Sequence, residues 1–132
     1  KLLKKNKIKI SGSKIAILGL GFRGDVTDSR LSPTYDVCKN FLKNNCQVFI
    51  HDPYILKDKK LPSSIHLSND LNIVTKNANL IFISTDHKQY SKLTKKSFSN
   101  MNKPFLIFDG RNILKKSNFS NFLIKTLGKS KN

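Results

Sequence analysis

Four short runs of apolar residues recur along this chain, separated by longer polar segments. They are KIAIL, QVFIH, LIFIS and FLIF, at residues 14–18, 47–51, 80–84 and 105–108. Each run is apolar nearly throughout, which is typical of a strand buried on both faces of a parallel sheet. Parallel strands need long crossover connections, usually helices. The pattern therefore predicts an α/β fold: a doubly wound, mostly parallel sheet in a Rossmann-like, three-layer α/β/α single domain.

The segments between these runs carry helix and turn signals. Ser32-Pro33 is an N-cap followed by proline at the first helical position, and Asn44-Asn45 tolerates the left-handed conformation that ends a helix. These signals predict a helix between them. The other expected elements are a short strand at 65–67, a helix capped by Ser68 and running to about Lys76, a helix at 91–102 and a last strand at 122–127.

Length and composition exclude several classes of protein. The chain has 132 residues and no apolar run near the ~18 residues that a membrane helix needs. We expect a basic lead-in at 1–13, one domain at 14–128 and a tail at 129–132. The lead-in lacks the apolar core and cleavage site of a secretory signal. Two cysteines fit neither a metal spacing nor a disulfide framework, so a reducing, cytoplasmic location is expected and no metal.

The net charge of +17 raises the alternative of a nucleic-acid-binding module. A binding stripe should be local, whereas lysine is spread along the whole chain. No helix-turn-helix pattern or aromatic-interleaved strand accompanies the lysines. The charge therefore predicts non-specific adhesion to polyanions at low salt, and solvated lysines explain it better than a specific nucleic-acid site.

The residues that follow the predicted strands are rich in aspartate. Five of the eight aspartates lie there: Asp25, Asp28, Asp52, Asp86 and Asp109. In open α/β sheets, ligands bind beyond the carboxyl ends of the strands. This edge is therefore the predicted location of a ligand site.

The first of these loops contains GLGFRG, which matches the dinucleotide fingerprint GxGxxG, at Gly19, Gly21 and Gly24. That fingerprint needs its third glycine in the first turn of a helix, so that the helix N-terminus faces the pyrophosphate. Here the first helix signal is Ser32, eight residues after Gly24. Asp52 is the nearest acid at a strand end that could bind a ribose, but it lies farther from the glycine motif than the ribose-binding acid usually does. A stand-alone NAD-binding Rossmann domain stays open as an alternative, and tight-turn glycines in a modified nucleotide-binding loop explain the motif better.

The arginines are more informative than the lysines. Of 25 basic residues only Arg23, Arg30 and Arg111 are arginine, and all three lie on the predicted ligand edge. Guanidinium differs from ammonium where bidentate contact with phosphate or carboxylate is needed. The placement favours a binding role for at least two of them, although chance or pairing of Arg30 with Asp28 would also explain it.

Groups able to perform covalent or acid–base chemistry are sparse. The three histidines, His51, His66 and His87, are isolated from one another in the sequence, and the chain has no Glu. Cys38 falls on the predicted core face of a helix, where it would pack rather than react. The sequence therefore predicts that this chain catalyses nothing alone.

Four segments taken together resemble one known family. KIAILGLGFRGDVTDSRLSPTYDV, FIHDPY, NANLIFISTDH and FLIFDGRNIL occur in the order and spacing of the C-terminal domain of the UDP-glucose/GDP-mannose dehydrogenase family. The resemblance runs from about Lys14 to Leu114. It implies a UDP-binding domain of an enzyme that oxidises the C6 hydroxyl of a nucleotide sugar to a carboxylate with two NAD.

The resemblance also implies partners for this domain. Intact members carry an N-terminal NAD-binding domain and a central helical region, which holds the catalytic Cys and Lys and builds the dimer. Neither is expected within these 132 residues. The full enzyme is expected to be a homodimer or a higher oligomer. Within the resemblance, the GDVTDSR and HDPY segments favour a UDP-N-acetylhexosamine as the substrate rather than UDP-glucose.

Site residues follow from the same resemblance, position by position. Phe22 would pack against the substrate, and Arg23, where the family has Lys, would place a cation near its phosphate or sugar. Arg111 in FDGRN matches a substrate-contacting arginine. Arg30 matches an arginine that reaches the NAD held by the other domain.

Overall fold

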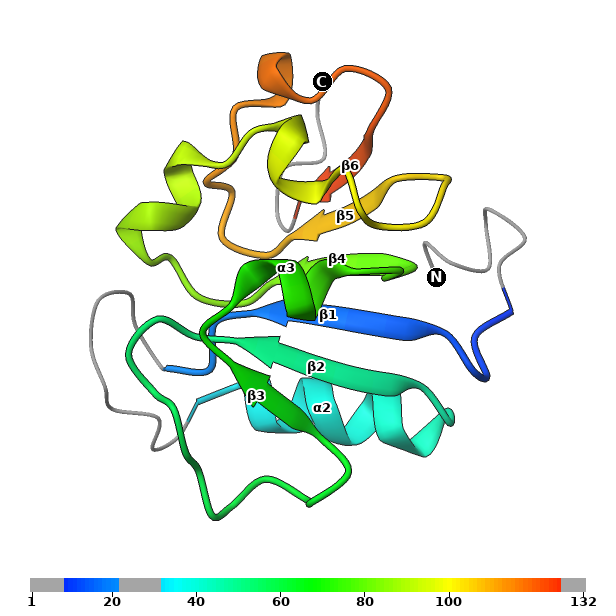
Figure 1. Cartoon of the computed structure of the whole chain (residues 1–132), viewed down its shortest axis with the longest axis vertical. Helices are drawn as coiled ribbons and strands as arrows, with labels where there is room; N and C mark the ends of the chain where they lie inside the picture. Colours follow the sequence, from blue (N-terminus) through cyan, green and yellow to red (C-terminus); the bar gives the residue numbers. More distant parts are fainter. Residues whose placement is uncertain (1–8, 22–31, 127–132) are drawn as a thin grey trace.

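A computed structural model of the chain describes residues 9–21 and 32–126. Within these two ranges, six strands form one sheet in the order β3-β2-β1-β4-β5-β6, and every neighbouring pair is parallel (Figure 1). The strands are β1 (Lys14–Leu18), β2 (Gln47–His51), β3 (His66–Ser68), β4 (Leu80–Ile83), β5 (Leu106–Asp109) and β6 (Leu123–Thr126). The helices in the described part of the chain are α2 (Thr34–Lys43), α3 (Leu71–Thr75) and the 3₁₀ turns η1 (Lys88–Lys92), η2 (Lys95–Phe98) and η3 (Lys116–Asn118).

The strand order is that of a doubly wound Rossmann-like sheet, as predicted. The chain starts at the centre with β1, proceeds outward to β2 and β3, and then returns to the other side of β1 with β4. The direction of winding therefore reverses between β1 and β4. In such sheets a crevice for ligands opens at this reversal, beyond the carboxyl ends of the strands.

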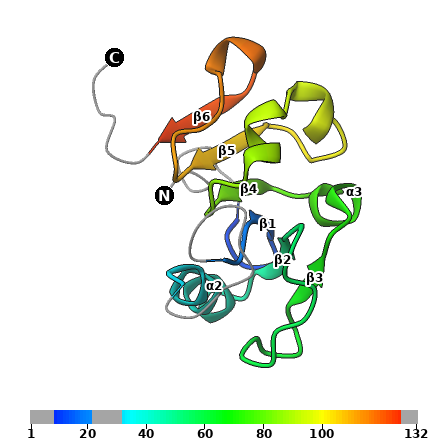
Figure 2. The same cartoon turned by 90° about the vertical axis from the view of Figure 1, so that its left-hand side faces the viewer.

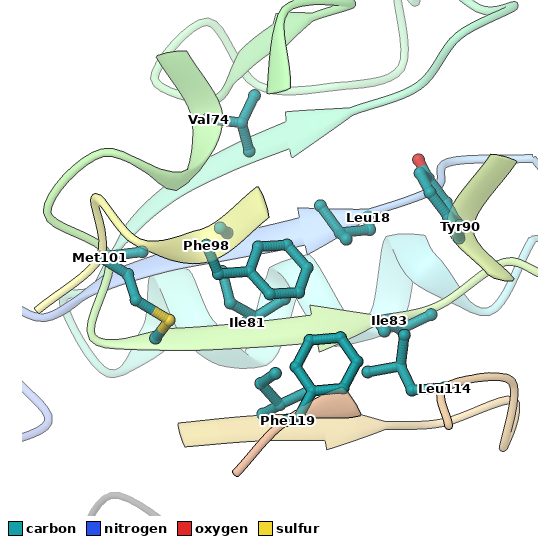
Figure 3. Packing of buried hydrophobic residues seen from close by; sticks show 12 residues of the cluster. Leu18, Val74, Ile81, Ile83, Tyr90, Phe98, Met101, Leu114 and Phe119 are labelled. Carbon is teal, nitrogen blue, oxygen red and sulfur yellow. The ribbon is translucent and has the colours of Figure 1, made fainter. Parts of the chain in front are cut away.

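Side chains alternate between two apolar cores, one on each face of the sheet. On β1, Ile15 and Ile17 point into the core shared with α2, while Ala16 and Leu18 point into the core under α3 and the 3₁₀ turns. Figure 2 shows α2 on one side of the sheet and α3 on the other. Figure 3 shows the second core, where Leu18 lies among the aromatic and aliphatic side chains of the covering segments. Because the strands are buried on both faces, they appear in the sequence as nearly continuous apolar runs.

The first predicted helix forms one residue later than expected. It begins at Thr34, and the Ser32 Oγ accepts a hydrogen bond from the Thr34 N–H at 3.2 Å. It ends as predicted: Asn45 has a φ of 62°, the left-handed conformation that asparagine tolerates. The sequence signals for both ends of this helix are thus confirmed to within one residue.

Two other helix predictions were wrong in detail. Residues 91–102 do not form one helix, because Thr94 is extended and its side chain starts a second turn, η2, in a capping box with Ser97. Ser68 does not cap a helix, because it is the last residue of β3. Asp70 is the cap, and its side chain accepts from the Asn72 N–H at 3.0 Å. The short strand predicted at 65–67 is displaced by one residue, and the last strand is confirmed as β6.

Within the described residues, no helix is long and apolar enough to cross a membrane.

Candidate functional site

The carboxyl ends of the strands bring together segments that are far apart in the sequence. Residues 19–21 follow β1, Asp52 follows β2, residues 84–87 follow β4, and residues 110–111 follow β5. All strand arrows in Figure 1 point toward this edge. The edge includes the reversal between β1 and β4, so it is the candidate functional site.

Gly19 makes the first turn after β1 possible. Its φ is +103°, and a Cβ added there would lie 2.3 Å from the Thr85 Cβ. The Thr85 Oγ1 donates to the Gly21 carbonyl at 2.8 Å, and the Gly19 N–H donates to the His51 carbonyl at 2.7 Å. The glycine therefore lets the β1 loop pack directly on the segment after β4. This is the tight-turn role expected of the first glycine in the motif.

Asp52 is the centre of a buried hydrogen-bond network at the same edge. Its Oδ2 accepts from the N–H groups of Leu20 at 2.8 Å and Gly21 at 3.3 Å, and it lies 3.1 Å from the His87 Nε2. Its Oδ1 accepts from the N–H groups of Tyr54 and Ile55 at 2.8 and 2.9 Å. The side chains of Asp52 and His87 are both fully buried. Both carboxylate oxygens are thus committed to holding protein segments, so Asp52 does not serve as a ribose-binding acid.

The network keeps Asp52 ionised. Burial by itself would raise the pKa of Asp52, but the hydrogen bonds from His87 and from the N–H groups of Ile55, Leu20 and Tyr54 outweigh burial and lower the pKa to about 2. An ionised carboxylate can only accept hydrogen bonds, so the His87 Nε2 carries the proton that it shares with Asp52.

A second buried pair, His51 at the end of β2 and Tyr90 in η1, lies next to this network. The His51 Nδ1 and the Tyr90 hydroxyl are 2.7 Å apart, and that hydroxyl donates to the His51 carbonyl at 3.1 Å. Figure 3 shows Tyr90 beside Leu18, at the carboxyl end of β1. Burial lowers the pKa of His51 and raises that of Tyr90 well above its ordinary value. Both groups are therefore neutral near pH 7, and they close the apolar core beneath the site.

Arg111 lies in a loop that Asp109 organises. The fully buried Asp109 accepts from the Arg111 N–H through Oδ1 at 3.2 Å, and from the N–H groups of Ile113 and Leu114 through Oδ2, each at 2.9 Å. The guanidinium extends over the end of β4: its Nη1 is 3.5 Å from the Ser84 carbonyl, and its Nη2 is 3.3 Å from the Asp86 Oδ2. The Arg111 side chain is 33% exposed, so its outer face is open to a ligand.

Comparison with known proteins now identifies the family. Residues 16–116 match the family described as "UDP-glucose/GDP-mannose dehydrogenase family, UDP binding domain". The chain belongs to this family. A match over this range confirms the resemblance that the four sequence segments indicated.

Individual relatives agree with this assignment. The chain is 31% identical to UDP-glucose 6-dehydrogenase 3 of Oryza sativa subsp. japonica and 32% identical to UDP-glucose 6-dehydrogenase 2 of Arabidopsis thaliana. Each match covers 91% of this chain but only 30% of the relative. The chain therefore spans less than a third of the length of these curated relatives.

Solved structures give the same result for the fold. An NDP-N-acetyl-D-galactosaminuronic acid dehydrogenase from Methanosarcina mazei Go1 superposes with a TM-score of 0.84 at 31% identity, over 96% of this chain and 27% of that one. The UDP-N-acetyl-mannosamine dehydrogenase Cap5O from S. aureus gives a TM-score of 0.75 at 30% identity, over 94% of this chain and 28% of that one. The described UDP-binding domain is thus similar to one part of these dehydrogenases.

The structure places some of the predicted site residues and not others. Arg111 lies at the predicted edge, beside the ends of β4 and β5. Phe22, Arg23 and Arg30 lie outside the described residues, as do Asp25 and Asp28. That the three arginines meet in one site therefore stays a prediction.

Sequence reasoning missed the partnership between Asp52 and His87. The sequence places Asp52 at a strand end, but it leaves His87 isolated from the other histidines and gives no reason to pair it with an acid. The available signal was that β2 and β4 both flank β1, which brings the residues after them to one edge. Cys38, in contrast, was interpreted correctly: it is buried in the core, and burial raises the pKa of its thiol to about 12.

Two further observations concern metal ligands and a cavity away from this edge. No group of three metal-ligating side chains occurs in residues 9–21 and 32–126. A cavity of about 580 Å³ lies at the opposite edge of the sheet, beside Lys14 and Phe49. There the Lys14 Nζ donates to the carbonyls of Ile73 and Lys76 at 3.1 and 2.7 Å, so it serves to cap the end of α3.

The low pKa of Asp52 predicts acid sensitivity of the fold. The folded-state pKa is about 2 against an ordinary value of 3.8, so ionised Asp52 stabilises the fold above about pH 4 and this stabilisation is lost as the pH falls toward 2. We expect about 2 kcal/mol of the free energy of unfolding to disappear over this range because of Asp52. Urea unfolding at pH 5.0 and pH 2.5 measures it, with Asp52→Asn for comparison. An equal loss in both proteins would contradict the assignment.

Proposed function

We propose that this chain is the substrate-binding part of an NAD-dependent UDP-sugar 6-dehydrogenase, which oxidises the C6 hydroxyl of the sugar to a carboxylate. Membership of the UDP-binding-domain family supports the nucleotide, and the relatives named above support the reaction. The proposed domain covers residues 14–128. We further propose that it works with an N-terminal NAD-binding domain and a central dimerisation domain, in a cytoplasmic enzyme that is a homodimer or higher oligomer.

The observation that carries the proposal is the position of Arg111. Asp109 fixes the Arg111 backbone N–H, and the guanidinium is held by the Ser84 carbonyl and the Asp86 carboxylate, close to the reversal of the sheet. A planar guanidinium with an open face suits bidentate contact with a diphosphate. Arg111 would bind and orient the UDP group, while Phe22 packs against the substrate and Arg23 adds a second cation.

The hydrogen bonds of Asp52 argue against an NAD site on this domain. A dinucleotide fold uses the acid after its second strand to hold a ribose. Here that acid is Asp52, and both of its carboxylate oxygens accept hydrogen bonds from backbone N–H groups of the protein itself. This favours the UDP-binding role over a stand-alone NAD-binding domain. We propose that NAD, which would accept the hydride, is held by the other domain and that Arg30 reaches it. The isolated chain would then be inactive.

The nature of the sugar is part of the same proposal. We propose a UDP-N-acetylhexosamine rather than UDP-glucose as the substrate. The M. mazei and S. aureus structures are named for N-acetylated sugars, and both superpose closely on this chain. The plant relatives, at similar identity, are named for UDP-glucose. Calorimetric titration with UDP-N-acetylmannosamine and UDP-glucose compares the two, and tighter binding of UDP-glucose would reverse the assignment.

Arg111→Ala tests the proposed binding role. We expect the Kd for UDP to rise tenfold or more, which corresponds to about 1.4 kcal/mol, because a charge-assisted contact with phosphate is lost. Arg111→Lys should recover only part of the affinity, since an ammonium cannot make the bidentate contact. Isothermal titration of the 132-residue chain with UDP measures both. Lys115→Ala, which removes an exposed cation from the same loop region, is the control. Equal affinity in wild type and Arg111→Ala would remove Arg111 from the site.

The two alternatives are separated by the same kind of titration. Binding of NADH without a response to UDP would favour a stand-alone NAD-binding domain. Submicromolar binding of duplex DNA that persists at physiological salt would favour a nucleic-acid module. We expect UDP to bind, and DNA affinity to vanish as salt is raised, because the lysines are dispersed over the chain.

A further inference from the structure

We propose that Asp86 is the counter-ion of Arg111 and competes with the diphosphate of the nucleotide for its guanidinium. The carboxylate would then hold the UDP affinity of the site below the affinity that the arginine could supply without it. This inference rests on the proposed function and deepens it, because it names a residue that limits nucleotide binding rather than one that contributes to it.

The packing of the strand ends brings Arg111 and Asp86 together. β4 and β5 are hydrogen-bonded neighbours, and the Gly110 N–H donates to the Ile83 carbonyl at 3.0 Å. A Cβ added at Gly110 would lie 2.8 Å from that carbonyl oxygen. The chain that leads into Arg111 therefore passes directly over the end of β4. This close approach places the guanidinium beside the Ser84 carbonyl and the Asp86 carboxylate.

The backbone of Asp86 is fixed by the residues on both sides of it. The Thr85 Oγ1 donates to the Gly21 carbonyl at 2.8 Å, and the His87 Nε2 lies 3.1 Å from the Asp52 Oδ2. Both neighbours are buried, whereas the Asp86 side chain is 43% exposed. The carboxylate can therefore leave Arg111 only by rotation about its own side-chain bonds, since its backbone is anchored to the interior.

This placement matters because the proposed ligand is an anion. The Arg111 Nη2 lies 3.3 Å from the Asp86 Oδ2, so a diphosphate on the same guanidinium would lie close to a second negative charge. Like charges at short range oppose binding.

The same ion pair could also help to orient the arginine, and the two effects oppose each other. An exposed ion pair contributes little to holding a side chain in place. Arg111 is held in addition by Asp109 at its backbone N–H and by the Ser84 carbonyl at its Nη1. The repulsion should therefore outweigh the loss of orientation, so that removal of the charge strengthens UDP binding.

Asp86→Asn tests the proposal because it keeps the size of the side chain and one oxygen acceptor but removes the charge. Asp70→Asn is the matched control. It removes the same charge from another exposed aspartate, and asparagine is an equally good helix cap there. Asp70 follows β3, whereas Arg111 follows β5, and β2, β1 and β4 lie between those two strands.

The measurement is calorimetric titration of the 132-residue chain with UDP. At low salt we expect Asp86→Asn to lower the Kd threefold or more and Asp70→Asn to leave it unchanged. The gain should shrink at high salt, because the two side chains are exposed and salt screens their charges. In an Arg111→Ala background, Asp86→Asn should lower the Kd less than twofold. This double-mutant cycle isolates the pair, because any effect of Asp86 through other residues is common to both backgrounds.

The outcomes separate this inference from the proposed function. If wild type binds UDP and Asp86→Asn lowers the Kd less than threefold, or raises it, the counter-ion role is overturned while the proposed function stands. A gain of the same size in the Arg111→Ala background would also overturn it, because Asp86 would then act without the arginine. If neither wild type nor Asp86→Asn binds UDP, the proposed function is overturned and this inference falls with it.

Discussion

Gly19→Ala is expected to lower the free energy of unfolding by about 4 kcal/mol, and to leave little folded protein if the domain has ordinary stability. Two effects add. A side chain at a φ of +103° is strained, and the new Cβ would lie 2.3 Å from the Thr85 Cβ and 2.9 Å from the Thr85 backbone N. Because one of these atoms is backbone, the neighbour cannot turn away. Urea unfolding followed by circular dichroism measures the change.

Gly12→Ala is the matched control for this substitution. Gly12 also has a positive φ, +86°, but no heavy atom lies within 4 Å of its added Cβ. We expect a loss of only about 1–2 kcal/mol, from backbone strain alone. The difference between the two variants measures the close approach of the β1 loop to Thr85. Equal losses would show that strain, rather than contact, explains the glycine at position 19.

Asp109→Ala is expected to cost about 3 kcal/mol of stability and to weaken UDP binding as well. The substitution leaves the N–H groups of Arg111, Ile113 and Leu114 without their acceptor, and an unsatisfied buried donor costs about 1–3 kcal/mol. The Arg111 loop would then lose its fixed conformation. Urea unfolding measures the first effect and UDP titration under folding conditions the second.

Asp70→Ala controls for the general loss of an aspartate that accepts from backbone. Asp70 caps α3 from an exposed position, so its removal should cost only about 1 kcal/mol and leave UDP affinity unchanged. If Asp109→Ala were no more destabilising than Asp70→Ala, the buried carboxylate would not be organising the loop. If it lowered stability but left UDP affinity intact, Arg111 would not depend on the loop for its position.

The sheet could be predicted closely because its strands are buried on both faces. A strand such as LIFI in β4 has apolar side chains on both sides, so each run is recognisable without knowledge of its neighbours. The covering segments were less predictable. Residues 91–102 carry helix-compatible residues, but the hydroxyls of Thr94 and Ser97 cap a separate turn, η2, which begins at Lys95. A local capping interaction thus outweighed a weak helical preference.

The candidate site was predictable in part for a different reason. Arg111 was found because arginine is rare in a lysine-rich chain and stands directly after a buried strand. The pairing of Asp52 with His87 was not found, since the two residues are 35 positions apart and nothing in the sequence links them. Their contact exists only because β2 and β4 are both neighbours of β1.

The sequence by itself determined the class of fold, the edge at which a ligand site is expected and the position of Arg111 at that edge, because apolar runs, glycines and rare residue types can be recognised within single segments. Only the tertiary structure decided which buried groups meet there. Asp52 has the sequence position of a cofactor-binding acid, yet five donors from three segments converge on it and make it a structural acceptor. Hydrogen bonds of this kind depend on strand order and register, which no single segment encodes.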